Sequence, residues 1–239
     1  MSTEKTWQKK ATDHYSRVAD ILLPNRQKIL SIIGRAATIL SPDSPRILDI
    51  GCGYGDVTAE VLRYAPQASV CMIDFSEEMV QRSAERFQRN KDIHVLRYDL
   101  NEGLPDRLQP QEFDAVVSCF ALHHVALEQR VPLYSQIYHV LKADGVFVNG
   151  DRFQEHSPSV HTWVFDEWVT WMQRQIQEKM GKERTFEEVK AQQMVHDERL
   201  GDKPETIWAM QRDLKQVGFA YVDCLFKAYH FGVIVATNQ

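Results

Sequence analysis

The chain has 239 residues, and its 28 Lys and Arg against 33 Asp and Glu give a formal charge of −5. Apolar residues make up 44% and charged residues 26%, a globular composition that excludes a disordered chain. The acidic balance argues against broad nucleic-acid or membrane-surface binding, because both are polyanions. No apolar leader and no run of about 18 apolar residues occurs, which predicts a cytoplasmic protein without a membrane span.

The first forty residues predict helices, with apolar residues near helical spacing and Pro24 as a break, and we expect segment 1–40 to cap the site. After a loop at 41–45, short apolar strands alternate with helices. The expected strands are 46–50, 68–73, 93–98, 113–120 and 145–149, and the expected helices are 56–64, 77–89 and 128–141. This alternation indicates βαβ units, and therefore a doubly wound α/β fold whose parallel sheet is covered on both faces.

The alternation stops after residue 150. Residues 151 to about 203 predict two helices without a strand, which we interpret as an insert in a domain spanning 41–239. The insert carries four aromatic residues, Trp163, Phe165, Trp168 and Trp171. They either pack on the sheet or line a lid over a pocket, and the two interpretations are compatible because one helix face can pack while the other lines the pocket. A helix at 204–216 and strands at 221–227 and 230–236 follow, and their tight connection requires antiparallel pairing.

The four cysteines form no C-x-x-C pair, and three fall in predicted strands, so we expect buried free thiols rather than disulfides or metal ligands. They are Cys52, Cys71, Cys119 and Cys224. His156 and His161 have no carboxylate at ligand spacing, and no H-E-x-x-H motif occurs. We therefore expect no metal site.

A glycine-rich turn at 51–55 joins the first strand to the first helix. Its G-x-G-x-G spacing differs from the dinucleotide pattern G-x-G-x-x-G, and Asp56 at the helix start disfavours a pyrophosphate. No Lys or Arg lies between Arg46 and Arg63 to hold phosphate. Carboxylates around the turn, including Asp49, instead suit a cationic or zwitterionic ligand.

Two further carboxylates end the next two strands. Asp74, which lies 23 residues after Gly51, can accept both hydroxyls of a ribose, and Asp99 can accept from an adenine amino group. Each alone is a common cap. Together with the glycine turn they follow consecutive strands, and this ordered set predicts a nucleoside site at the carboxyl edge of the sheet.

These motifs resemble the class I S-adenosylmethionine-dependent methyltransferases over 46–150. Segments 113–124 and 141–147 resemble that family's fourth-strand motif and its turn into strand five. The resemblance implies a seven-stranded, mostly parallel Rossmann-like sheet with an antiparallel last strand, S-adenosylmethionine as cofactor, and a small-molecule acceptor. The cofactor contacts it implies are Asp49 for the amino end; Gly51, Cys52 and Gly53 for the methionine part; Asp74 for the ribose; Phe75, Met79, Asp99 and Leu100 for adenine; and Cys119 at the sulfonium.

On the acceptor side, the resemblance implies that His123 faces the acceptor. We expect His123 and Asp151 as catalytic residues. The expected substrate contacts are His123, Tyr15, Arg152, Trp163 and Arg199. Either imidazole of the pair 123–124 can stand at the rim of the active site, or it is a polar loop histidine. Asp151 and Arg152 either act on the substrate or form a salt bridge that holds the insert.

Segments 14–20 and 227–236 also resemble a narrower group, the carboxy-S-adenosylmethionine synthases, with Arg199 as the candidate for their substrate-carboxylate arginine. Three hypotheses follow: a small-molecule methyltransferase, a carboxymethyl-forming synthase, and a cofactor-binding partner subunit without catalysis. The sequence leaves the oligomeric state open between monomer and homodimer.

Overall fold

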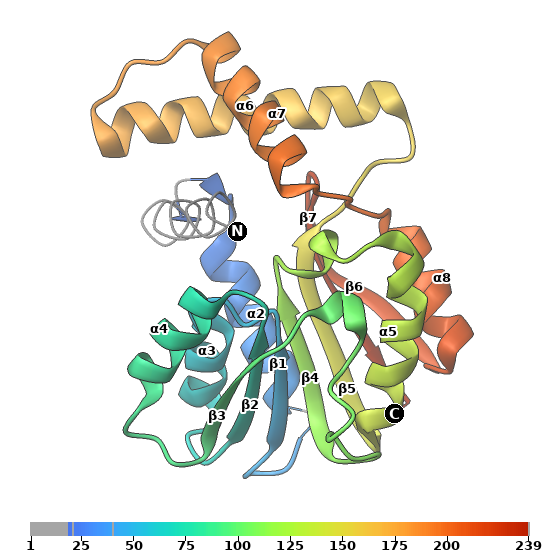
Figure 1. The fold of residues 1–239 in the computed structure, drawn as a ribbon. Coiled ribbons are helices and arrows are strands. Elements are labelled where there is room, and N and C mark those ends of the chain that lie inside the picture. The colour runs from blue at the N-terminus through green and yellow to red at the C-terminus, as the bar shows by residue number, and fades with distance from the viewer. Residues whose placement is uncertain (1–18, 21, 40, 239) are drawn as a thin grey trace.

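A seven-stranded sheet in the order β3-β2-β1-β4-β5-β7-β6 forms the centre of the protein (Figure 1). The computed structural model describes residues 19–20, 22–39 and 41–238. The strands are β1 (Arg46–Ile50), β2 (Ser69–Asp74), β3 (Ile93–Arg97), β4 (Phe113–Cys119), β5 (Leu141–Arg152), β6 (Tyr221–Ala228) and β7 (Phe231–Thr237). Strand β7 is antiparallel to both of its neighbours and the other pairs are parallel, which confirms the predicted fold class.

Strand β5 is longer than the expected 145–149 and ends at Arg152. The reason is its antiparallel neighbour, because β7 pairs Asp151 with Gly232 and Arg152 with Phe231. Asp151 and Arg152 therefore belong to the sheet, and the insert begins after them.

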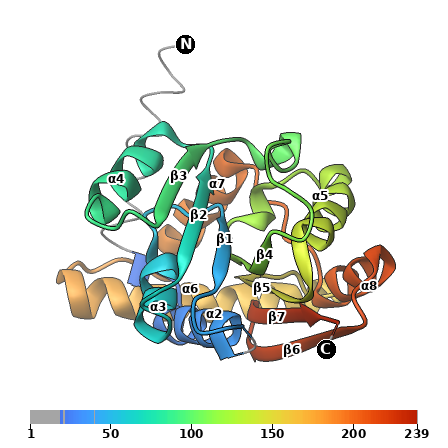
Figure 2. The same cartoon turned by 90° about the horizontal axis from the view of Figure 1, so that it is seen from below.

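Helices cover both faces of the sheet, as Figures 1 and 2 show. One face carries α2 (Arg26–Ile39), α3 (Asp56–Tyr64) and α4 (Glu77–Phe87); the other carries α5 (Leu127–Val140) and α8 (Ile207–Val217). Each face has its own apolar core, with Ile29, Ile33 and Val57 buried in the first and Leu133, Ile137 and Leu214 in the second. Two 3-10 helices follow β3 and β4, at Leu100–Glu102 and Leu122–His124.

The insert consists of two helices that lie across the carboxyl-end edge of the parallel strands (Figure 1). They are α6 (Pro158–Met180) and α7 (Phe186–Leu200). Ser157 caps α6, and Thr185 forms a capping box with Glu188 at the start of α7. Gly181 and Gly201 end the two helices in the left-handed conformation, where glycine carries no steric penalty.

The aromatic residues of the insert divide between packing and exposure. Trp168 is 4% exposed, lies edge-on to Phe231 at 5.5 Å, and donates its indole N–H to Leu22 O at 2.7 Å. Trp163 is 55% exposed and lies against Tyr229. Trp168 is therefore part of the core, as the packing interpretation expects.

Among the described residues, no helix is long and apolar enough to cross a membrane. All four cysteines are free thiols. Cys52 is buried, whereas Cys71 and Cys119 are partly buried and Cys224 is exposed on the edge strand β6, which corrects the expectation that all four are buried.

Candidate functional site

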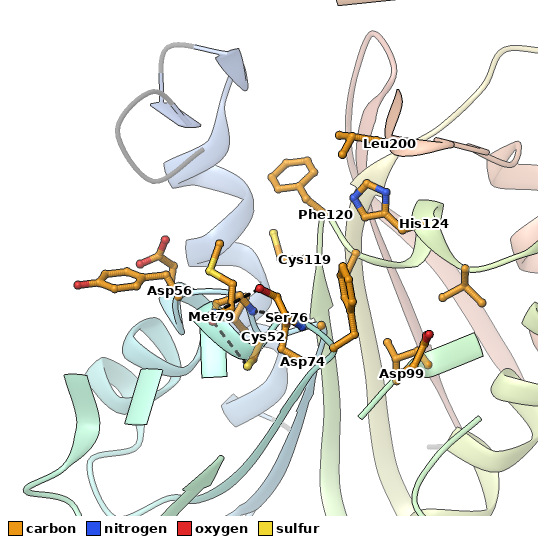
Figure 3. Close-up of a pocket in the computed structure, with 18 of the residues that line it drawn as sticks. Cys52, Asp56, Asp74, Ser76, Met79, Asp99, Cys119, Phe120, His124 and Leu200 are labelled. Atoms are coloured by element: carbon orange, nitrogen blue, oxygen red, sulfur yellow. Dashed lines mark hydrogen bonds between the residues drawn. The ribbon is translucent and has the colours of Figure 1, made fainter. Parts of the chain in front are cut away.

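A cavity of about 490 Å³ opens at the carboxyl ends of the parallel strands (Figure 3). Segments that follow β1, β2, β3 and β4 form its floor and walls. Two distant parts of the chain complete it, namely Leu22, Arg26 and Leu30 before and within α2, and His196, Arg199 and Leu200 of α7. The carboxyl edge of a doubly wound sheet is where such folds bind ligands.

The glycine turn forms the floor of the cavity. Gly51, Gly53 and Gly55 all have positive φ values, of 65°, 52° and 81°, which L side chains rarely adopt. A Cβ on Gly51 would lie 2.2 Å from Ala121 Cβ, so no side chain fits there. A Cβ on Gly53 would meet nothing within 4 Å, which leaves the backbone at Gly53 open to a ligand.

Asp74 ties the end of β2 to this turn. Its two oxygens accept the backbone N–H groups of Gly53 at 2.8 Å and Ser76 at 2.9 Å. Burial raises the pKa of Asp74, and these backbone bonds oppose the shift. Each carboxylate oxygen keeps a further lone pair that a ligand hydroxyl can use, so the position fits a ribose.

Asp49 lies beneath the turn and is fully buried. Thr58 donates its hydroxyl to Asp49 Oδ2 at 2.7 Å, whereas Oδ1 has no hydrogen-bond partner among the described residues. Burial raises the pKa of Asp49 to about 7. Asp49 does not itself line the cavity. Its unpaired oxygen is nevertheless a site that a cationic ligand group can stabilise, so the residues present fit a zwitterionic cofactor.

The remaining predicted cofactor residues lie around the same space. Cys52, Phe75, Met79, Asp99, Leu100 and Cys119 all line the cavity. Asp99 is exposed and accepts from the Asn101 backbone and side chain, both at 2.9 Å, so it also caps the short helix after β3. Burial raises the pKa of the Cys119 thiol well above its usual range, which keeps this side chain neutral.

Two arginines from outside residues 46–63 lie close to the turn. Arg26 from α2 and Arg86 from α4 both bind the carboxylate of Asp56 at the start of α3. Burial alone raises the pKa of Asp56, but its bonds to Arg86 and Arg26 outweigh this effect and lower the pKa. Because Asp56 engages both guanidinium groups, these arginines do not turn the site into a phosphate site.

A second part of the cavity is built from the end of β4 and the end of α7. Phe120 follows Cys119 with a φ of 53°, an uncommon value for a residue with a side chain. Figure 3 shows Cys119, Phe120, His124 and Leu200 around one space above Asp74. This part of the cavity offers apolar walls and the imidazoles of His124 and His196.

His123 lies behind the cavity wall, although we expected it to face the acceptor. Its Nδ1 is 2.5 Å from Asp151 Oδ1, its side chain is 10% exposed, and it does not line the cavity. Burial lowers the pKa of His123, but Asp151 and Asp202 outweigh burial and raise the pKa. His123 and Asp151 thus form a buried ion pair beside the site, with the pKa of Asp151 lowered despite its burial.

Of the adjacent pair, His124 is the histidine that lines the cavity, and His196 of α7 lines it as well. The Nδ1 of His124 lies 3.0 Å from Asp202 Oδ1, and this carboxylate favours the tautomer with the proton on Nδ1 and the lone pair on Nε2. Burial, followed by the charge of His123, lowers the pKa of His124. A neutral imidazole oriented by a carboxylate can act as a general base. Sequence reasoning missed Asp202, whose only signal was its place at the end of the insert.

The other expected acceptor contacts have separate outcomes. Arg199 lines the cavity. Arg152 instead forms two bonds to Asp197, at 3.0 and 2.9 Å, so the structure contains the salt bridge that holds the insert. Trp163 lies outside the cavity, because its position on α6 turns it toward Tyr229. Tyr15 falls outside the described residues.

Comparisons with known proteins agree with this geometry. Residues 48–147 match the family model described as a methyltransferase domain. The carboxy-S-adenosyl-L-methionine synthase of Pseudoalteromonas atlantica is 25% identical over 222 residues, which cover 91% of this chain and 86% of that protein.

Two solved structures share the fold. A SAM-dependent methyltransferase from Aquifex aeolicus has a TM-score of 0.57 at 17% identity, over 94% of this chain and 98% of that one. The phosphoethanolamine N-methyltransferase 2 of Haemonchus contortus, solved with S-adenosyl-L-methionine, has a TM-score of 0.60 at 16% identity, over 90% and 53%. The resemblance to the class I S-adenosylmethionine-dependent methyltransferases is confirmed: residues 48–147 match a methyltransferase-domain model, and the solved structures share the fold.

Proposed function

We propose that the protein transfers the methyl group of S-adenosylmethionine to a small-molecule acceptor. The observation that carries this proposal is that one cavity joins a nucleoside end, with Gly53, Asp74 and Asp99, to an acceptor end with Phe120 and His124. Its volume of about 490 Å³ lies in the range of small-molecule sites. Because the cofactor takes part of this space, the acceptor is small.

The cofactor end supports binding through three features already described. The open backbone at Gly53 can pass beneath the methionine part, and Asp74 can accept from the ribose hydroxyls. Asp49 Oδ1 has no hydrogen-bond partner among the described residues, and a cationic amino group near it would favour the ionised carboxylate. S-adenosylmethionine carries no phosphate, which agrees with Arg26 and Arg86 being bound to Asp56.

When bound, the cofactor supplies a methyl group that its positive sulfur has already activated. The chain then mainly aligns the acceptor with this carbon, a contribution that can reach about 7–11 kcal/mol of the barrier. Where the acceptor atom carries a proton, His124 Nε2 takes it. Asp202 fixes the ring, and the lowered pKa keeps the imidazole neutral and ready to accept.

We also propose that the segment before α2 and the insert together cap the cavity. Leu22 and Arg26 reach it from one side, and Arg199 and Leu200 of α7 from the other. The four free thiols favour a reducing compartment, so we assign the reaction to the cytoplasm.

The test is to incubate the protein with methyl-labelled S-adenosylmethionine and a small-molecule cell extract. We expect label in a product and release of S-adenosylhomocysteine, and we expect both to fall in His124→Gln while this variant still binds the cofactor. Cofactor binding without any turnover across extracts would instead support a partner subunit without catalysis.

A second candidate is a carboxymethyl-forming synthase. It is favoured by Arg199, whose place in the cavity lining would let its guanidinium donate to a substrate carboxylate, and by relatives such as the one from Pseudoalteromonas atlantica. Mass spectrometry of the cofactor after the same incubation separates the two activities. A carboxylated sulfonium product identifies the synthase, and a demethylated cofactor identifies the methyltransferase.

A further inference from the structure

Outside the cavity, three metal-ligating side chains meet at the base of the insert. They are Glu155 in the connection from β5 to α6, His161 in the first turn of α6, and His230 in the turn between β6 and β7. None of them lines the cavity. They meet because β5 and β7 pair up to their ends at the sheet edge that the insert covers (Figure 1).

The distances within this cluster are short. His161 Nδ1 lies 3.2 Å from Glu155 Oε2, and His230 Nδ1 lies 4.0 Å from the same oxygen. The expectation that His161 has no carboxylate partner is thereby corrected. That expectation rested on ligand spacings within helical motifs, whereas Glu155 belongs to the irregular segment before α6.

His230 has an unusual environment for a polar side chain. It is 1% exposed, and neither ring nitrogen has a hydrogen-bond partner among the described residues. Trp168 and Phe231 each lie edge-on to it at 5.1 Å. A buried polar group without partners requires an explanation. Burial, followed by the charge of Arg152, lowers the pKa of His230 to about 3, so its imidazole is neutral and keeps the lone pair that a metal needs.

We propose that Glu155, His161 and His230 bind one divalent transition-metal ion, with Zn²⁺ as the best fit. Two imidazoles and one carboxylate suit zinc and its neighbours, whereas Mg²⁺ and Ca²⁺ prefer oxygen ligands. Bond lengths of about 2.0–2.2 Å in a tetrahedral site place ligand atoms roughly 3.3 Å apart. The pair at 3.2 Å already has this separation, and the pair at 4.0 Å reaches it by a small side-chain movement.

The contacts of Glu155 leave its Oε2 facing the two histidines, where it can bind the ion. Lys227 Nζ lies 3.3 Å from Oε1, whereas both histidines approach Oε2. Carboxylates that bind metals are commonly held through such outer contacts. The Lys227 side chain is 43% exposed, so its charge can move toward solvent when the cation binds. The ion would join α6 to the hairpin of β6 and β7, and water would fill its open positions.

The experiment uses the full-length protein freed of metal with a chelator. Zn²⁺ is titrated by calorimetry in a competing buffer, and Co²⁺ is titrated by its visible absorption. We expect one equivalent at this site and a Tm rise of roughly 5–10 °C when free Zn²⁺ exceeds its Kd about 100-fold. Separate His161→Ala and Glu155→Gln variants should each lose at least about 10-fold in affinity.

Two controls decide the assignment. His156→Ala removes an exposed histidine of the same connection and should bind Zn²⁺ like the wild type. His124→Ala breaks the other candidate trio, His123, His124 and Asp202, and should also keep this equivalent. Because His161 is 35% exposed, its variant should fold, which circular dichroism checks. No Zn²⁺ binding by the wild type, or binding lost in His124→Ala and kept in His161→Ala, would overturn the proposal.

Discussion

Replacing Asp74 by Ala tests the cofactor end of the site most directly. The change removes the carboxylate that the ribose is expected to contact, and charge-assisted hydrogen bonds contribute about 1.5–3 kcal/mol. We therefore expect the Kd for S-adenosylhomocysteine to rise about 10- to 150-fold. The variant also leaves the N–H groups of Gly53 and Ser76 without their acceptor, which should lower the free energy of unfolding by about 1–3 kcal/mol.

Asp114→Ala is the matched control for this variant. Asp114 has the same 7% exposure as Asp74 and also accepts one backbone N–H, that of Arg46 at 2.8 Å. It lies at the opposite, amino-end edge of the sheet, at the start of β4. Urea unfolding should therefore show a lower free energy of unfolding in both variants. Calorimetry with S-adenosylhomocysteine should show weaker binding only in Asp74→Ala. Wild-type affinity in Asp74→Ala, or equal losses of affinity in both, would refute the assignment.

Three further changes test the rest of the structure. His124→Gln should lower kcat by about 10²- to 10⁴-fold and leave the cofactor Kd near its wild-type value, and steady-state rates equal to wild type would remove His124 as the base. Metal-free His230→Phe should gain stability relative to wild type as pH falls from 6.5 toward about 3, by up to about 1.4 kcal/mol per pH unit. The reason is that His230 has a lowered pKa in the folded chain, so as the pH falls the unfolded wild-type chain binds a proton at this histidine before the folded chain does. If His230 is solvated, urea unfolding across this pH range should show no difference in trend between the two proteins. Trp168→Ala should cost about 3–5 kcal/mol of the free energy of unfolding, whereas the exposed Trp163→Ala should stay within about 0.5 kcal/mol; similar melting curves for the two would contradict the packing described.

Most of the fold could be predicted because its strands are short apolar runs that alternate with helices. The turn between Ala228 and Phe231 was readable as a hairpin, since no crossover helix fits there. The full length of β5 was not readable. Residues 141–144 and 150–152 are not a uniform apolar run, and pairing with β4 and β7 carries the strand past the expected range.

The site was predictable where its residues follow strands, and less so where it depends on contacts between distant segments. Asp74 and Asp99 could be placed from their order along the chain. Which of His123 and His124 lines the cavity depends on Asp151, at the end of β5, and on Asp202, after α7. The sequence around His123 and His124 does not indicate these distant partners. Without them, it cannot be predicted which of the two adjacent histidines lines the cavity.

Arg152 has a consequence for how ligands enter and leave. Its guanidinium binds Asp197 on α7 twice, and the ring of Trp168 on α6 covers it at 5.3 Å. Pulling both helices away would break this ion pair and remove the indole ring that packs on the guanidinium, so these contacts oppose such a movement. Amide hydrogens around Asp197, in the last turn of α7, should therefore exchange slowly. Ligand entry that moves this end of α7 would first have to break the ion pair.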